Sequence, residues 1–411
     1  MITRRIFLKN GGLAVLGMGT VPTFLFRTAM AASPAGRKKV LVTIFQRGGA
    51  DGLNIVVPFG EKNYYSYRPS IAIPAPSKKG TSALDLDGFF GLHPSLKPLL
   101  PVYKEGNLGI VPAAGSPDPT RSHFEAQDFM ESGTPGNKLI SDGWLNRYLY
   151  HNRDPKATAF RGLSVGEMLP RSLKGRAPAV ALKSVSEFGL DVSKANEQGR
   201  SLYESLYHEE TNSLLSGTAQ EMFDAIDFLK KANLDQYQPA DGVTYANNAF
   251  AQSLKQVSQL IKANVGLEVA CVDIGGWDHH SNEVFQLTQR LQRFGGALAA
   301  FYRDLGDRME DVVVLSMSEF GRTARENGSA GTDHGHANVM FVMGGPVKGG
   351  KVYGQWPGLA QEQLNEDRDL ALTTDFRDIL AEVLVRHLGC QKAEVVFPGF
   401  KIDAQRFTGM I

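Results

Sequence analysis

The sequence predicts an α/β protein in which a mostly parallel sheet is covered by helices on both faces. Short apolar runs rich in β-branched residues recur along the chain, and each ends in a glycine-rich polar turn. Amphipathic helical patterns lie between these runs. With 411 residues, of which 42% are hydrophobic, the chain is long enough to bury a large core.

Six apolar runs are expected to be strands, at residues 40–45, 108–112, 179–182, 269–273, 312–316 and 339–343. Uninterrupted apolar runs suit strands that are buried on both faces, which favours a parallel sheet between two helical layers. The clearest helical patterns span residues 282–305 and 373–388, and the second ends before Gly389.

The segment at about residues 183–263 has a different composition, rich in Ser, Gln, Glu, Lys and Leu and poor in glycine. It predicts several amphipathic helices without a strand. We interpret it as a helical insertion that covers the edge of the sheet where ligands bind. Residues 33–411 are then expected to form one α/β domain that contains this insertion.

Residues 1–32 predict a cleaved export signal. The stretch "TRRIFLK" places an arginine pair before an apolar run at residues 11–26, and small residues follow at 29–32. This looks like a twin-arginine signal, so the twin-arginine export machinery is an expected partner and the periplasm or the extracellular space the destination. The apolar run is shorter than the ~20 residues that span a bilayer. No stable membrane span is expected after cleavage.

The composition also excludes several classes of protein. The 44 Lys and Arg residues balance 43 Asp and Glu residues, so the net charge does not favour nucleic-acid binding. The two cysteines, Cys271 and Cys390, lie in separate segments, which excludes a disulfide scaffold and a zinc ribbon.

Polar motifs follow several of the predicted strands. In open α/β sheets, ligands bind beyond the carboxyl ends of the strands. The motifs that end there are "QRGGADGLN" with Asp51, "RSHFE" with Ser122 and His123, "GGWDHHSN" with Asp278, His279 and His280, "SEFGRT" with Glu319 and Arg322, and "GTDHGHAN" with His334 and His336.

Carboxylates and imidazoles together offer the donors that zinc, manganese and iron accept. The sequence therefore predicts that these motifs share a site for a metal or an oxyanion, and a metal there is expected to be divalent: zinc, manganese or calcium. Its candidate ligands are Asp51, Asp278, His279, His280, Glu319, His334 and His336.

Three further residues are candidates for catalysis. Ser122 at a helix start would meet amide donors and the positive end of the helix dipole, which stabilise an anion or an alkoxide. His123 could bind the same anion, and Arg322 could hold a planar oxyanion by two parallel bonds. The structural alternatives are a capping box of Ser122 with Glu125 and a surface ion pair for Arg322.

The motifs "FQRGGADGLNIVVP", "RSHFEAQDFM", "GGWDHHSN" and "SEFGRT" with "GTDHGHAN" resemble those of the DUF1501 family of exported proteins, from about residue 38 to the C-terminus. That family is similar to the alkaline phosphatase and sulfatase superfamily, whose members use a hydroxyl nucleophile at a helix start and metals held by Asp and His at strand ends. The resemblance implies an alkaline phosphatase-like fold with Ser122 as nucleophile and with Asp51, Asp278, His279 or His280, and His334 or His336 as metal ligands.

One position departs from the superfamily pattern. Glu319-Phe320 stands where its members carry an Asp-His pair, so one expected histidine ligand is absent. A two-zinc site does not follow directly, since His334 or His336 could replace that ligand or a single metal could suffice.

The sequence leaves three functions open. The first is an exported metal-dependent hydrolase of phosphate or sulfate esters, acting on a small-molecule or polysaccharide substrate. The second is a non-catalytic exported scaffold, or a carbohydrate- or partner-binding protein, that keeps the fold. The third is a metal-free enzyme, for which the adjacent Ser122 and His123 would need an aspartate from elsewhere to form a triad.

Overall fold

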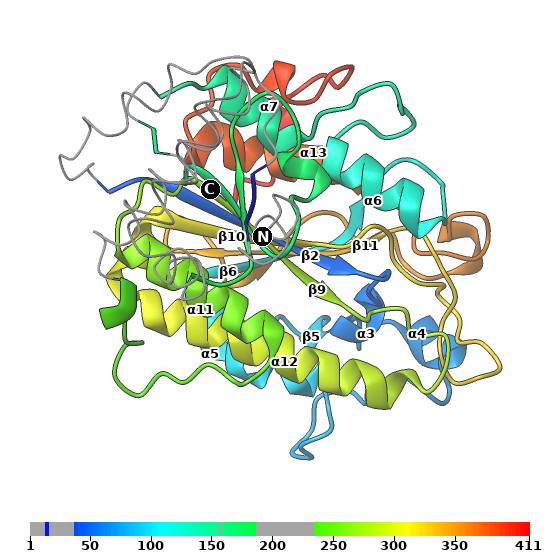
Figure 1. Cartoon of the computed structure of the whole chain (residues 1–411). Helices are drawn as coiled ribbons and strands as arrows, with labels where there is room; N and C mark the ends of the chain where they lie inside the picture. Colours follow the sequence, from blue (N-terminus) through cyan, green and yellow to red (C-terminus); the bar gives the residue numbers. More distant parts are fainter. Residues whose placement is uncertain (1–12, 16–36, 155–156, 159, 186–233) are drawn as a thin grey trace, which may run out of the picture.

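The computed structural model describes residues 13–15, 37–154, 157–158, 160–185 and 234–411 (Figure 1). Most of the predicted export signal and residues 186–233 of the predicted insertion lie outside the described residues. Among the helices described, none combines the length and the apolar character needed to cross a membrane.

The strands are β1 (Leu13–Val15), β2 (Val40–Arg47), β3 (Val56–Val57), β4 (Leu84–Asp85), β5 (Gly91–Leu92), β6 (Leu108–Gly115), β7 (Gly162–Val165), β8 (Val180–Leu182), β9 (Val269–Gly275), β10 (Val312–Met317), β11 (Asn338–Gly344), β12 (Lys351–Val352) and β13 (Thr374–Asp375). The α-helices are α3 (Gly52–Ile55), α4 (Lys62–Tyr67), α5 (Leu100–Lys104), α6 (His123–Ser132), α7 (Trp144–His151), α11 (Ala249–Lys262), α12 (Glu283–Leu305) and α13 (Phe376–Glu382). Short 3-10 helices are η1 (Pro94–Leu99), η2 (Arg171–Leu173), η3 (Leu234–Gln236), η4 (Gly306–Asp311), η5 (Gln361–Gln363), η7 (Ala393–Val395) and η8 (Ala404–Arg406), and η6 (Val383–His387) is a π-helical turn.

The central sheet has the strand order β1-β8-β7-β9-β2-β10-β11-β6-β12, and β13 also pairs with β6. Strands β8, β7, β9, β2 and β10 are parallel to one another, whereas β11 runs antiparallel to both β10 and β6. The edge strand β1 pairs antiparallel with β8 and lies within the predicted export signal, so removal of that signal would leave β8 at the edge. The mostly parallel α/β class predicted from the sequence is confirmed.

Helices cover both faces of this sheet (Figure 1). Along β2, Val40, Val42 and Ile44 face one core with α11, α12 and α5, while Leu41 and Phe45 face the other with α6, α7 and α13. This alternation follows from the two-residue period of a strand, and it explains why the strand reads as an unbroken apolar run.

All six predicted strands are confirmed, as β2, β6, β8, β9, β10 and β11. Strand β7 was not predicted, and the segment 373–388 was predicted as one helix but begins with β13, whose Asp375 then caps α13 by accepting from the Arg377 amide. In the described part of the predicted insertion, α11 packs beside α12 and against β9, with Leu254, Val257 and Leu260 buried.

The carboxyl ends of β2, β6, β9 and β10 meet at one edge of the sheet, together with the start of the antiparallel β11. Every polar motif named above follows one of these ends. The fold therefore gathers segments that are more than 200 residues apart in the chain, such as His334 and Arg121.

Candidate metal centre

Three connections deliver the polar side chains to the carboxyl edge. The turn after β9 carries Asp278 and His280, α6 begins with His123 just after β6, and the long connection from β10 to β11 carries His334. That connection folds back on itself, because the Gly321 amide donates to the His336 carbonyl at 2.8 Å and the Gly335 amide to the Gly321 carbonyl at 2.9 Å. A Cβ atom at Gly321 would lie 1.9 Å from the Ala337 carbonyl oxygen, so only glycine allows this close approach.

The four side chains of His123, Asp278, His280 and His334 converge, and we call them the histidine–aspartate cluster. In the part of the chain that the structure describes, the ligand atoms of His123, Asp278 and His334 all lie within 4.8 Å of one another. The His280 Nε2 atom is 2.9 Å from Asp278 Oδ1 and 3.1 Å from His334 Nε2, and His334 Nε2 is 3.2 Å from the same Oδ1. Tetrahedral zinc with bonds of 2.0–2.1 Å would separate its ligand atoms by about 3.3 Å, close to these spacings.

Each imidazole of the cluster has its other nitrogen bonded to an acceptor. His123 Nδ1 lies 2.8 Å from Glu319 Oε1, and His334 Nδ1 lies 2.9 Å from the Arg121 carbonyl oxygen. His280 Nδ1 lies 3.0 Å from Asp333 Oδ1. The hydrogen bond from His280 lowers the pKa of Asp333, and the one from His123 lowers that of Glu319 against the opposing effect of burial, so both carboxylates are ionised and only accept.

These partners fix the tautomers. Because a carboxylate and a carbonyl oxygen cannot donate, each Nδ1 carries a hydrogen, which leaves Nε2 as the nitrogen of each ring that can bind a metal. The Nε2 atoms of His280 and His334 lie 3.1 Å apart, and they lie 2.9 and 3.2 Å from Asp278 Oδ1, whereas the buried Nε2 of His123 has no hydrogen-bond partner. A cation bound among these atoms would take the place of the Nε2 hydrogens, and carboxylate–histidine pairs of this kind are the usual support of protein metal ligands.

The charges around the cluster also suit a divalent cation. Asp278, Glu319 and Asp333 contribute three negative charges, and Arg322 contributes one positive charge through its contact with Asp278 Oδ1 at 2.6 Å. Burial opposes ionisation of Asp278, but the hydrogen bond and charge of Arg322 outweigh it and lower its pKa to about 2. Burial lowers the pKa of His334, which favours the neutral imidazole that binds a metal, whereas the hydrogen bond to Glu319 raises the pKa of His123, so that a metal would have to displace a proton from that ring.

Arg322 is not positioned as the substrate clamp that the sequence predicted. Its side chain is 2% exposed, and the guanidinium donates to the carbonyl oxygens of Gly48, Gly49, Trp277 and Thr332 as well as to Asp278. It is not a surface ion pair either. These bonds tie the connection after β2 to the turn after β9, so we assign to Arg322 the positioning of Asp278.

Three of the predicted metal ligands lie outside the cluster. Asp51 is 1% exposed and bonded to Arg68. His279 points into the protein, where its Nε2 lies 2.9 Å from the Gly276 carbonyl and burial lowers its pKa to about 4. His336 lies among Asp369, Arg121 and Glu366, and burial lowers its pKa as well. A fourth, Glu319, lies behind His123 as its hydrogen-bond acceptor.

Ser122 is the N-cap residue of α6 in an extended conformation, and its side chain makes no cap hydrogen bond. The predicted capping box is therefore wrong, because Glu125 accepts from Thr120 Oγ1 at 2.9 Å instead. Ser122 stands in the chain between two residues that contact the cluster, Arg121 through its carbonyl and His123 through its ring.

Residues 108–398 match the family model described as a protein of unknown function, DUF1501, over more than half of the chain. The chain belongs to the DUF1501 family. No curated protein matches this DUF1501 sequence.

Solved structures are similar at low identity. Alkaline phosphatase PafA is 9% identical with a TM-score of 0.34, and 70% of this chain aligns with 64% of PafA, so the chain spans less than two thirds of that protein. The lipoteichoic acid synthase LtaP from Listeria monocytogenes is 10% identical with a TM-score of 0.33, over 84% of this chain and 71% of LtaP.

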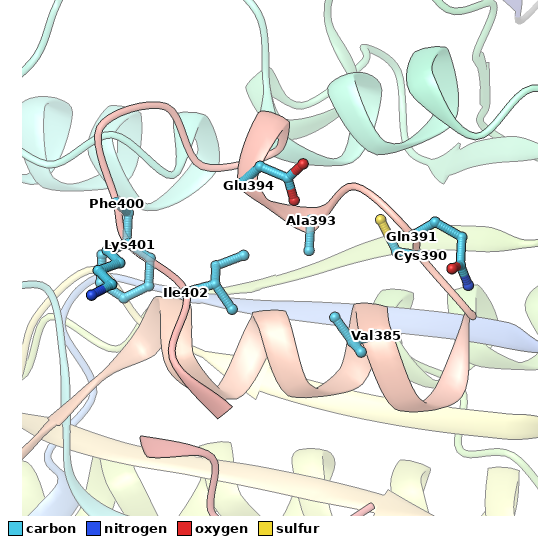
Figure 2. Close-up of a pocket in the computed structure, with 8 residues that line it drawn as sticks. All are labelled: Val385, Cys390, Gln391, Ala393, Glu394, Phe400, Lys401 and Ile402. Atoms are coloured by element: carbon cyan, nitrogen blue, oxygen red, sulfur yellow. The ribbon is translucent and has the colours of Figure 1, made fainter. Parts of the chain in front are cut away.

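A hollow of about 460 Å³ lies elsewhere, near the end of α13 and η6 (Figure 2). His387 in η6 bonds to the carbonyl of Val40, the first residue of β2, which places this hollow toward the opposite edge of the sheet. It contains no member of the histidine–aspartate cluster; its lining residues are Val385, Cys390, Gln391, Ala393, Glu394, Phe400, Lys401 and Ile402.

Proposed function

We propose that this DUF1501 protein is an exported, metal-dependent hydrolase of phosphate or sulfate esters. One observation carries the proposal: the ligand atoms of His123, Asp278 and His334 lie within 4.8 Å of one another, His280 Nε2 lies 2.9 Å from Asp278 Oδ1 and 3.1 Å from His334 Nε2, and the Nδ1 of each of these imidazoles is bonded to an acceptor. Such a donor set fits a divalent transition metal such as zinc or manganese. Calcium, also considered from the sequence, prefers oxygen ligands and fits less well.

In this proposal His123, Asp278 and His334 hold the metal, with His280 as a fourth ligand. A bound divalent cation supplies Lewis acidity and neutralises charge on the ester and on the departing oxygen. Glu319, Asp333 and the Arg121 carbonyl hold the imidazoles in the ligating tautomer, and Arg322 holds Asp278.

The start of α6 supplies the second half of the anion site. The first amides of a helix lack intrahelical acceptors and point toward an anion placed at its N-terminus. Since Ser122 caps none of them, both the amides and the hydroxyl remain available to a substrate. We propose that Ser122 Oγ bonds to the phosphorus or sulfur atom as the bond to the leaving oxygen breaks, and that the hydroxyl proton ends on that oxygen, directly or through water, to give the alcohol. Water then attacks the seryl ester, which breaks the new bond to Oγ, restores the Ser122 hydroxyl and releases the inorganic anion.

The N-terminal sequence supports export through the twin-arginine pathway to the periplasm or the outside of the cell, where a small-molecule or polysaccharide ester would be the substrate. The sequence does not distinguish phosphate from sulfate, so both belong in the test.

The test uses the mature protein loaded with zinc or manganese and assayed on p-nitrophenyl phosphate and p-nitrophenyl sulfate. We expect turnover of one ester that falls at least about a hundredfold in Ser122→Ala, in line with the loss of a nucleophile. Ser281→Ala, which removes an exposed hydroxyl beside His280, is the matched control and should keep full activity. Absence of turnover in the metal-loaded protein would reject the proposal and favour the non-catalytic alternative, whereas full activity in Ser122→Ala would reject Ser122 as the nucleophile.

A further inference from the structure

A second polar site lies deeper in the same edge of the sheet, and it is closed. Asp51 follows β2 and Arg68 follows α4, and their side chains are 1% and 0% exposed. Arg68 Nη1 donates to Asp51 Oδ2 at 2.5 Å and Nη2 to Asp51 Oδ1 at 3.0 Å, so the guanidinium takes both carboxylate oxygens.

Four oxygen atoms surround this guanidinium. Besides the two of Asp51, the Thr323 carbonyl accepts from Nη2 at 2.8 Å and the Ala324 carbonyl accepts from Nε at 3.0 Å. A buried charge is retained only when it is paired and hydrogen-bonded, and Arg68 satisfies both conditions. Both carboxylate oxygens of Asp51 accept hydrogen bonds from Arg68.

Glu283 completes the surroundings of the pair. It is 0% exposed, accepts from Asn54 Nδ2 at 2.8 Å and from Thr332 Oγ1 at 2.7 Å, and interacts with Asp51. Burial raises its pKa, and so does the charge of Asp51, whereas Arg68 keeps the pKa of Asp51 low against the effect of burial. One fixed cation therefore pairs with the Asp51 carboxylate, and the raised pKa of Glu283 favours its protonated form.

We propose that the chain binds a single metal ion, at the histidine–aspartate cluster, and that the Arg68 guanidinium occupies the place of a second cation at the end of β2. The resemblance noted in the sequence assigned Asp51 to a metal, and the geometry assigns it to Arg68. The proposal rests on the metal centre of the proposed function but not on ester hydrolysis. Arg68 donates to the carbonyl oxygen of Thr323, the residue after Arg322 in the chain, and the charge of Arg322 also lowers the pKa of Asp51.

The first test is the metal content of the mature wild-type protein after dialysis against zinc or manganese, measured by plasma mass spectrometry. One equivalent is expected. Two equivalents would overturn the single-metal inference while leaving the metal centre intact, whereas zero equivalents would overturn both this inference and the metal centre.

The second test asks whether Arg68 occupies a cation site. Arg68→Ala leaves two Asp51 oxygens, two carbonyl oxygens and Glu283 around a cavity, so we expect this variant to bind one additional equivalent of manganese or calcium and to melt at a higher temperature when the ion is added. The double variant Arg68→Ala with Asp51→Asn is the matched control and should not bind the additional ion.

A folded Arg68→Ala protein that takes up no additional ion at millimolar manganese or calcium would overturn the proposal. If Arg68→Ala folds only when the ion is present, the ion-dependent gain in folded protein supports a cation site at this position. The metal content of the wild-type protein then still tests whether the wild type binds a single ion. His334→Ala separates the two sites, because it should remove the first equivalent and leave the additional ion of Arg68→Ala in place. These counts are independent of whether any ester is hydrolysed.

Discussion

Glu319→Gln tests the role assigned to the carboxylate behind His123. Glu319 Oε1 accepts from His123 Nδ1, from Gln127 Nε2 and from the Gly48 amide, each at 2.8 Å, and Oε2 accepts from Ser318 Oγ at 2.9 Å. A glutamine can present its carbonyl oxygen to the three donors at Oε1, so the substitution removes the negative charge and preserves the shape. The His123 imidazole then becomes a weaker ligand because its Nδ1 hydrogen faces a neutral acceptor.

Loss of such a supporting partner weakens metal binding by roughly 10- to 100-fold, or about 1.4–2.7 kcal/mol. The upper half of this range is expected here, because the Glu319 side chain is 0% exposed and solvent does not screen its charge. The assay is a competition titration of zinc against a chromophoric chelator at pH 7.5, with thermal melting of the metal-free proteins to confirm that both are folded.

Asp333→Asn is the matched control, since it makes the same change behind His280. The Asp333 side chain is 53% exposed, so its charge is screened by water and the loss of affinity should stay below about tenfold. An affinity of Glu319→Gln equal to that of the wild type, or a larger loss in Asp333→Asn than in Glu319→Gln, would refute the argument that buried carboxylates prepare the imidazoles.

Three further outcomes are expected. Gly321→Ala should lower the free energy of unfolding by about 1–3 kcal/mol and weaken metal binding, because its Cβ would lie 1.9 Å from the Ala337 carbonyl oxygen. Denaturant unfolding measures the stability and zinc titration the affinity, and an unchanged unfolding midpoint would contradict the prediction. Burial lowers the pKa of His387 to about 4, so the unfolded chain takes up a proton below pH 6.5 before the folded one does, and stability falls as the pH falls from 6.5 toward 4. His387→Gln, which cannot take up a proton, should lose about 2 kcal/mol less than the wild type between pH 7.5 and pH 5, and equal losses in the two proteins would disprove this. Arg322→Met should leave Asp278 without its buried partner and reduce metal content, whereas full occupancy in a folded variant would argue against a positioning role.

The strands of the sheet were predictable where they are buried on both faces. Apolar runs such as residues 40–45 and 312–316 carry that signal, because neither face of the strand meets water. Strand β7 carries too little of this apolar signal to be predicted. It has only four residues, Gly162–Val165, and its glycine and serine resemble a turn, although pairing with β8 and β9 fixes it as a strand.

The candidate site was predictable in its location but only partly in its members. The sequence places Asp278, His280 and His334 at strand ends, and the structure brings them together. It cannot separate His279 from His280, because neighbouring residues point in different directions and the turn after β9 decides which ring faces inward. His123 was expected to act on the substrate, and its contact with Glu319 depends on a pairing between residues 196 positions apart.

The place of Arg68 had no signal in the sequence. The residue lies in the ordinary stretch "YYSYRPS", and its contact with Asp51 depends on how α4 folds back over the end of β2. The role of Arg322 could not be predicted for the same reason. An arginine after a strand suggests a substrate clamp, and only the structure shows that its guanidinium donates to backbone carbonyls.

An anomalous difference map from crystals of the zinc-loaded mature protein, recorded at the zinc absorption edge, tests the account most directly. The account predicts one strong peak within about 2.0–2.2 Å of the ligand atoms of the histidine–aspartate cluster, and none beside Asp51. No peak at the cluster, or a peak between Asp51 and Glu283 with Arg68 displaced, would contradict it.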